Sequence, residues 1–188
     1  MALNSNNVAV GITGAIYLGG SAATRPTDAK TPLTTGWDDL GYTSDAGVTE
    51  SRSLSSSDIA AWQNGDVVRK VVTSASMTIK AMLLETTKKT VGLYYGTTVG
   101  DDGLVKVVPS RTGSRHKMCV DVIDGDKFIR TYIPQGQVTE VGDQVYAGGT
   151  PIGYEVTITA YADESIIDED GAIGCAEKWY SQLVVGKP

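Results

Sequence analysis

Residues 61–96 constrain the fold of this chain more than any other part of its sequence. They open with the turn signal Asn64-Gly65, which is followed by a run of valines that favours extended backbone. Residues 76–82 then alternate between apolar and polar side chains, which is the pattern of a half-buried strand. From Leu83 the apolar spacing becomes helical, and Gly96 suits the end of a helix. The stretch therefore predicts a strand, a tight turn, a second strand and a helix over about residues 83–95.

The composition predicts one mainly β domain. The chain has 188 residues, enough to bury a sizeable core, and its content of 41% hydrophobic and 20% charged residues argues against disorder. Its 22 glycines and single clear helical segment favour many turns between strands. No apolar run is long enough to span a bilayer, and the N-terminus lacks the features of a signal peptide. We therefore expect a protein that is made and kept in cytoplasm, with no membrane segment.

Alternating patterns predict the other strands of this domain. The clearest lie at residues 8–18, 118–123, 128–133 and 150–162, and weaker ones lie at 48–54 and 104–108. Asp124-Gly125 is a strong hairpin signal between two of them. Ser57 or Asp58 is expected to cap a short helical turn at 59–62. We place the β domain at residues 1–162 and interpret residues 163–188 as a C-terminal extension packed on the same domain.

Residues 19–47 form a long segment without periodicity. Connections of this length in a compact domain are usually functional or disordered, and apolar side chains such as Leu33 and Trp37 argue against disorder. Two interpretations stay open. Either the segment folds back onto its own domain, or it is an arm that docks on a neighbouring subunit through Trp37, Leu40 and Tyr42.

The formal net charge of −6 and the pI of about 4.7 argue against a protein that grips nucleic acid. Such a protein needs cations to displace the counterions of the phosphates, and this chain has a net deficit of them. The most basic segment is residues 110–117, which contains Arg111, Arg115 and His116. This segment can form an exposed loop, touch phosphate, or pair with an acidic patch of another copy, and the negative net charge favours pairing.

The residues that carry most enzyme chemistry are scarce. A catalytic triad or dyad would have to use His116, the only histidine, and the sequence has no nucleophile elbow. One histidine and two separated cysteines, Cys119 and Cys175, argue against a zinc site, and both thiols are expected to be free. The acidic residues from Asp163 onward do not match a calcium-binding loop, and no phosphate-binding loop is present. The sequence therefore predicts no catalytic residue, no metal and no cofactor.

The predicted strands need partners. Exposed strand edges are aggregation hazards unless they are covered or paired, and identical subunits can pair their edges until a ring closes. Our hypothesis is that the strands around 67–82 and 118–133 build the sheet that closes such a ring.

Long stretches of the sequence resemble the major tail tube proteins of long-tailed bacteriophages, especially those that infect actinobacteria. The resemblance covers most of the chain and is carried by GWDDLGYTSDAGVTESR (36–52), SSSDIAAWQNGDVVRKVVTSASMTIKAMLLETTKKTVGLYYG (55–96), KMCVDVIDGDKFIRTYIPQGQVTEVG (117–142) and IGYEVTITAYAD (152–163). It implies a tail-tube-type β-sandwich or partial barrel with one flanking helix. It also implies that the long loop in the N-terminal half reaches adjacent subunits.

The resemblance further implies what the protein does. Subunits would join their sheets around a six-fold ring, and rings would stack into the tail tube of a virion, assembled in the host cytoplasm. The tube would carry the genome and the tape measure protein, and terminator and tip proteins would be further partners. Double-stranded DNA would pass without specific binding, because an acidic wall repels its phosphates. The expected interface residues are Trp37, Leu40, Tyr42, Arg111, Arg115 and His116.

A rival interpretation comes from another class of protein. In a ligand- or carbohydrate-binding β-sandwich module, Trp37, Trp62 and Trp179 would serve as stacking platforms for the ligand. A hydrolase that depends on His116 is a more distant alternative.

Overall fold

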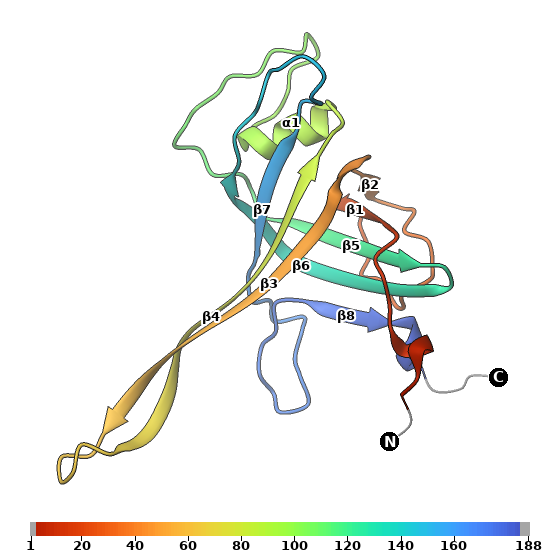
Figure 1. The fold of residues 1–188 in the computed structure, drawn as a ribbon. Coiled ribbons are helices and arrows are strands. Elements are labelled where there is room, and N and C mark those ends of the chain that lie inside the picture. Colours follow the sequence, from red (N-terminus) through yellow and green to blue (C-terminus); the bar gives the residue numbers. More distant parts are fainter. Residues whose placement is uncertain (1–2, 185–188) are drawn as a thin grey trace.

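The computed structural model describes residues 3–184, which form a mainly β fold with one α-helix. Its elements are η1 (Ser5–Asn7), β1 (Thr13–Gly19), β2 (Trp37–Asp39), β3 (Thr43–Ala60), β4 (Val67–Leu83), α1 (Lys88–Tyr95), β5 (His116–Asp124), β6 (Lys127–Val141), β7 (Tyr154–Ala160), β8 (Glu177–Tyr180) and η2 (Ser181–Leu183). One antiparallel sheet has the order β2-β1-β5-β6-β7-β4-β3, with β8 beside β6. Within the described residues β2 and β3 do not pair, so the sheet stays open (Figure 1). The expected mainly β fold with one helix is confirmed.

The long strand β6 divides this sheet into two halves. Its first part pairs with β5 on one side and, over residues 129–132, with β8 on the other. From Gly136 onward it pairs with β7 instead. Figure 1 shows β6 bending between these two directions. One half of the sheet is therefore β2-β1-β5-β6-β8, and the other half, which we call the β6-β3 half, is β6-β7-β4-β3.

The main core lies between the two halves of the sheet and beneath α1. In β7 the buried side chains alternate with half-buried ones, and the buried set is Tyr154, Val156, Ile158 and Ala160. They pack with Ile79, Ala81 and Leu83 of β4 and with Ile16, Met118 and Ile133 from the other half. The alternation in 150–162 correctly predicted this buried face, although β7 itself begins only at Tyr154.

Helix α1 begins later than the sequence predicted. β4 continues to Leu83, which pairs with Tyr154 of β7, so the expected first turn of helix is extended backbone. The helix begins after Thr87, whose hydroxyl accepts a hydrogen bond from the backbone N–H of Thr90 at 3.1 Å. It ends as predicted at Gly96, which has a φ of 62°.

The segment 20–36 folds back onto its own domain and covers the second face of β5 and β6. Trp37 at its end is buried, its indole N–H donates to the carbonyl of Thr24 at 3.1 Å, and its ring contacts Tyr132 edge to face at 6.1 Å. Ala23 and Cys119 complete this second cluster. Burial raises the pKa of the Cys119 thiol to about 12, so this sulfur stays protonated and unreactive at neutral pH.

Gly36 closes this covering segment and cannot be replaced without strain. Its φ is +76°, and a Cβ would lie 2.5 Å from the backbone of Ala22 and Ala23. Gly103 has nearly the same φ, +78°, with nothing within 4 Å of a Cβ. We expect Gly103→Ala to lower the free energy of unfolding by about 1–2 kcal/mol, the cost of left-handed backbone, and Gly36→Ala by about 2–5 kcal/mol, because crowding adds to it. Urea denaturation measures both, and equal losses would show that crowding at Gly36 has no effect.

Several predicted elements differ in the structure. The helical turn expected at 59–62 is absent, because Ile59 and Ala60 belong to the end of β3 and pair with the start of β4, and residues 62–64 form the hairpin turn. Residues 104–108 form no strand, and the strand expected at 8–18 begins only at Thr13, with Val8, Val10 and Ile12 exposed before it. The C-terminal segment contributes β8 to the sheet, and its last residues, 185–188, lie outside the described part of the chain.

Candidate functional site

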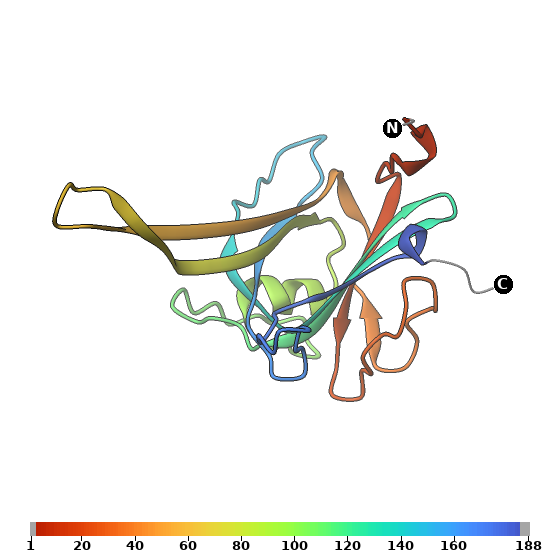
Figure 2. The ribbon, with the colours of Figure 1, turned by 90° about the horizontal axis from the view of Figure 1, so that it is seen from below.

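The β3–β4 hairpin projects from the body of the protein as a long two-stranded arm (Figures 1 and 2). β3 and β4 pair with each other along their length, but the pairing of β4 with β7 begins only at Met77. Residues 53–76, which we call the arm, therefore pair only with each other. All of them are exposed apart from Ala61 and Val71, which are half-buried. An isolated two-stranded hairpin is at best marginally stable in water, so the arm is expected to need a partner.

The turn of the arm was predicted correctly. Gly65 has a φ of 70° and its N–H donates to the carbonyl of Ala61 at 3.0 Å, while the Ala61 N–H donates to Asp66 at 2.7 Å. These bonds close the hairpin at the Asn64-Gly65 dipeptide. The tip also carries Trp62, which is 95% exposed.

One face of the arm, which we call the apolar face, carries Leu54, Val67 and Val72 beside Ser56 and the 3.4 Å ion pair of Asp58 and Lys70. The register places Leu54 opposite Ala75, and Ser56 opposite Val72, on the side that continues from Met77 and the core residue Ile79. Val67 lies further along, opposite Ala60. Leu54, Val67 and Val72 are each more than half exposed, so this face leaves large apolar side chains in water. Apolar surface of this kind commonly marks a site of protein association.

The opposite face of the same strands is rich in hydroxyl groups. On the β6-β3 half it presents Thr49, Ser51 and Ser53 of β3, Ser76 and Thr78 of β4, Thr157 and Thr159 of β7, and Thr139 of β6. We call this the hydroxyl face. Its members are exposed or half-buried, and the Thr139 and Thr159 hydroxyls lie 2.7 Å apart. Its charged residues are Lys80 and Glu155, which form a 2.9 Å ion pair, and Glu140.

Both outer edges of the β6-β3 half are open. Within residues 3–184, β3 pairs with β4 alone, and no strand pairs with β6 beyond Gly136 on the side that faces β5. A groove of about 410 Å³ lies beside residues 138–141 of this edge, between them and the segment 107–113. The backbone of two strand edges is thus available for pairing with another chain.

The six predicted interface residues lie in different environments. Trp37 and Leu40 are in the core, at 8% and 1% exposure, so they offer a neighbour little surface in this conformation. Tyr42 is 77% exposed, and its backbone N–H donates to Glu85 at 3.0 Å. Whether these residues contact another subunit stays a prediction.

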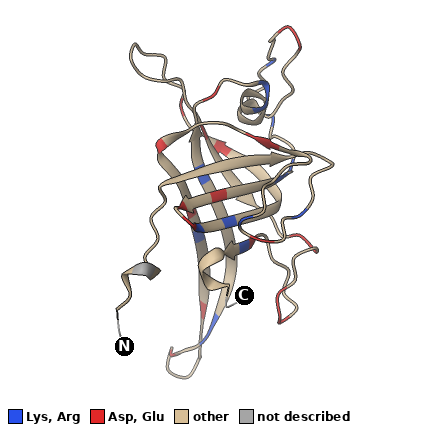
Figure 3. Ribbon diagram, turned by 90° about the vertical axis from the view of Figure 1, so that its right-hand side faces the viewer, with Lys and Arg blue, Asp and Glu red and all other residues tan. Residues whose placement is uncertain are grey.

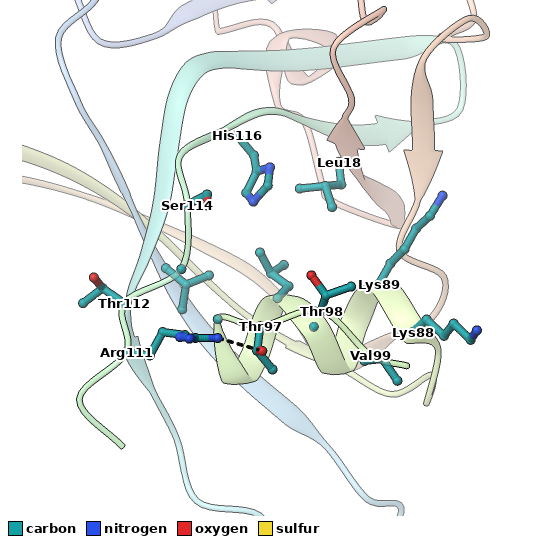
Figure 4. A pocket seen from close by; sticks show the side chains of 15 residues that line it. Leu18, Lys88, Lys89, Thr97, Thr98, Val99, Arg111, Thr112, Ser114 and His116 are labelled. Atoms are coloured by element: carbon teal, nitrogen blue, oxygen red, sulfur yellow. Dashed lines mark hydrogen bonds between the residues drawn. The ribbon is translucent and has the colours of Figure 1, made fainter. Parts of the chain in front are cut away.

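Two basic residues of the predicted set lie around a cavity of about 760 Å³ between α1 and the start of β5 (Figure 4). Arg111 and His116 line it together with Lys88 and Lys89, and Arg111 donates to the Thr97 hydroxyl at 3.1 Å. Lys88 pairs with Asp101 at 2.7 Å and Lys89 with Asp38, so part of this charge is balanced inside the chain. Arg115 stacks on Tyr161, with 4.1 Å between its guanidinium carbon and the ring centre.

His116 has the environment of a packed side chain. Burial lowers its pKa, which keeps the imidazole neutral at neutral pH. Its labelled neighbours in the cavity are threonines, a serine, a leucine, a valine and cations, with no carboxylate among them. Among the described residues, no group of three His, Cys, Asp or Glu side chains is placed to hold a metal ion.

The three tryptophans do not share a surface. Trp37 is buried and Trp179 of β8 packs against the same second cluster, whereas Trp62 lies at the tip of the arm. A stacking platform made from all three is therefore absent. No helix in residues 3–184 has the length and hydropathy to cross a bilayer.

Comparison with known proteins gives one family match. The model of a family described as phage tail tube protein matches residues 1–170. A comparison with curated proteins gives no match. Among solved structures, the tail of an empty gene transfer agent particle, refined with C6 symmetry, is 11% identical with a TM-score of 0.43, covering 93% of this chain and 98% of that one. A crystal structure of an Hcp protein is 11% identical with a TM-score of 0.31, covering 88% and 98%.

Proposed function

The chain belongs to the phage tail tube protein family, and from this premise we propose that its copies assemble edge to edge into rings and that the arm joins one ring to the next. As a member of that family it is a structural protein of the virion tail. The proposal assigns it no enzymatic activity. The observation that carries the proposal is the pair of open strand edges on the β6-β3 half.

These two strand edges can pair with each other between neighbouring copies. β3 ends the sheet on one side, and the segment 138–141 of β6 leaves an edge free on the other. A contact between β3 of one copy and β6 of the next is head to tail, and head-to-tail contacts generate rings when the rotation closes. Closing the ring removes both outer edges of this half in the body of the protein, and closed barrels avoid edge-to-edge aggregation for the same reason. Six copies is the order that the sequence resemblance implies.

The arm is long enough to leave the ring to which its body belongs. At about 3.3 Å per residue, a hairpin of about 12 residues per strand extends roughly 40 Å. A globular domain of this size has a radius of gyration of about 16 Å. The arm can therefore reach a copy in an adjacent ring, where its apolar face, with Leu54, Val67 and Val72, would be covered.

The proposal of further partners rests on the sequence resemblance. They are the tape measure protein and DNA inside the tube, and the terminator and tip proteins of a long-tailed phage, of the actinobacteriophage kind. The described residues offer no separate site by which to choose among them.

Cysteine cross-linking tests the head-to-tail edge contact. Both chains carry Cys175→Ser, which removes the partly exposed native thiol. Cys119 is left in place because it is buried. One adds Thr49→Cys, Ser51→Cys or Ser53→Cys on β3, and the other adds Thr139→Cys on β6. Disulfides need Cα atoms about 4.4–6.8 Å apart, so one of the β3 positions is expected to link to Thr139→Cys in mixed tubes. A chain with one cysteine is expected not to link to itself, because the contact joins two different edges.

Two results would contradict the proposal. One is a protein that negative-stain microscopy and sedimentation show to be monomeric however concentrated it is. The other is tubes in which β3 cysteines link to each other and never to Thr139→Cys, which would place the ring contact elsewhere.

A further inference from the structure

We infer that the hydroxyl face lines the bore of the tube and lets duplex DNA slide because it is hydrated and almost uncharged. This inference rests on the proposed ring, and it names the surface that the passing nucleic acid meets. It differs from the acidic wall that the net charge of the chain led us to expect.

The first step is geometric. When the β6-β3 halves close into a ring, one face of each must point inward and the other outward. One face carries the main core, α1 and the whole of the other half of the sheet, whereas within the described residues no element packs on the hydroxyl face. Figure 2 shows α1 and the other half lying on one side of β3 and β4. A narrow bore leaves no room for that bulk, so the hydroxyl face is the one that points inward.

The second step compares the charge of the two faces. The opposite orientation would place the cavity of Lys88, Lys89, Arg111 and His116 toward the bore, because this cavity is lined by Leu93 and Val138 on the core side. Cations that contact phosphates release counterions, and many such contacts along a duplex sum to a strong grip. A tube that must release its DNA would be blocked by that orientation.

The third step concerns the hydroxyl face itself. It presents eight Ser and Thr hydroxyls, whereas its charges are Lys80, Glu155 and Glu140, so its formal charge is −1. The ion pair between Lys80 and Glu155 leaves Glu140 as the single charge on this face that forms no ion pair among the described residues. Hydroxyl groups both donate and accept hydrogen bonds, so they hold a layer of water without selecting the sign of a passing charge.

The acidic residues of the chain lie elsewhere. Figure 3 shows red on the loop between β7 and β8, at the lower right, and on the loop that follows α1, at the top right. These loops contain Asp168, Glu169 and Asp170, and Asp101 and Asp102. The net charge of −6 is thus carried largely away from the hydroxyl face.

The position of the hydroxyl face is tested by heavy-atom labelling. Tubes are assembled from Cys175→Ser protein that carries either Thr78→Cys, in the middle of the hydroxyl face, or Glu169→Cys, on the exposed loop between β7 and β8. Both are labelled with a maleimide gold cluster and viewed in cross-section by electron microscopy. We expect the Thr78 label in the bore of the tube and the Glu169 label outside the bore. A Thr78 label on the outer surface overturns the inference, whereas a failure of the parent protein to form tubes would instead count against the proposed function.

The charge argument is tested with a short fluorescent DNA duplex. Tubes of unmodified protein are expected to retain none of it in a nuclease-protected form. Tubes with Thr78→Lys and Thr159→Lys are expected to retain protected duplex, with an affinity that falls about a thousand-fold or more between 50 and 200 mM salt. The matched Thr78→Asn and Thr159→Asn tubes should behave like the unmodified ones, and Glu169→Lys tubes should bind only duplex that the nuclease can digest. Protected duplex in unmodified tubes would overturn the inference.

If the lysine variant does not assemble, the result is still decided by the other arms. The gold label reports the position of the face, and protected duplex in unmodified tubes reports its affinity.

Discussion

Arg130→Ala is expected to lower the free energy of unfolding by about 3–5 kcal/mol, more than the loss of any exposed charge in the described chain. Arg130 and Asp121 form the ion pair that is buried on both sides, at 3% and 7% side-chain exposure. The Arg130 Nε–H and Nη2–H groups donate to the two oxygens of Asp121 at 2.7 and 2.6 Å. Breaking such a pair leaves an uncompensated charge inside the protein, which is the source of the loss.

The same guanidinium also holds the covering segment 20–36 on the sheet. Its Nη1 group donates to the carbonyl oxygens of Asp28 at 3.2 Å and Thr31 at 2.6 Å. These carbonyls are presented by a turn in which the Asp28 carboxylate accepts from the Thr31 hydroxyl and the Lys30 and Thr31 N–H groups. Those bonds lower the pKa of Asp28 to about 2, the Thr31 hydroxyl contributing most. Loss of Arg130 should therefore loosen the segment as well as weaken the core.

Two measurements separate these effects. Urea denaturation gives the free energy of unfolding, and trypsin cleavage after Lys30 reports the segment, which should be cut faster in Arg130→Ala. Arg25→Ala is the matched control, because its pair with Glu177 is half-exposed on the arginine side and is expected to contribute no more than about 1 kcal/mol. If Arg130→Ala does not fold, Arg130→Lys, which keeps the charge and loses the fork of donors, should fold with a smaller loss. Equal losses at Arg130 and Arg25 would contradict this account.

Local signals in the sequence predicted the turns and the ends of elements. Asn64-Gly65, Asp124-Gly125 and Gly96 act through the left-handed backbone that glycine adopts, with φ values of 70°, 60° and 62°. Such conformations depend on a few neighbouring residues. The turns and element ends could therefore be predicted from the local sequence, without knowledge of the tertiary packing around them.

Features that depend on partner strands could not be predicted in the same way. The serines of β3 have little preference for extended backbone, and pairing with the valines of β4 decides their structure. The valines predicted a strand, but nothing in residues 61–83 shows that β7 ends at Ala160 and leaves most of β4 without a second neighbour. An arm in residues 19–47 was one of two interpretations that the sequence left open, and Trp37 of this segment packs on its own domain because β5 and β6 offer it a second apolar face.

Removal of the arm is expected to abolish tube formation and to leave the protomer folded. Excising residues 54–75 and joining Ser53 to Ser76 through Asn-Gly gives a two-residue hairpin, because Ser53 and Ser76 already pair. The excised residues are exposed or half-buried and lie outside both hydrophobic clusters. The free energy of unfolding should therefore change little, whereas sedimentation and negative-stain microscopy should show no tubes.

Substitutions within the arm should give a graded form of the same result. Burial of one Leu or Val side chain contributes about 1.5–3 kcal/mol, and 1.4 kcal/mol is a factor of ten in an equilibrium constant. Leu54→Ser and Val72→Ser, on the apolar face, should therefore each raise the critical concentration for assembly about tenfold or more. Ser57→Ala, on the opposite face, is the control and should leave it unchanged. Normal tubes from the armless protein would show that rings stack without this hairpin, and the apolar face would then need another partner.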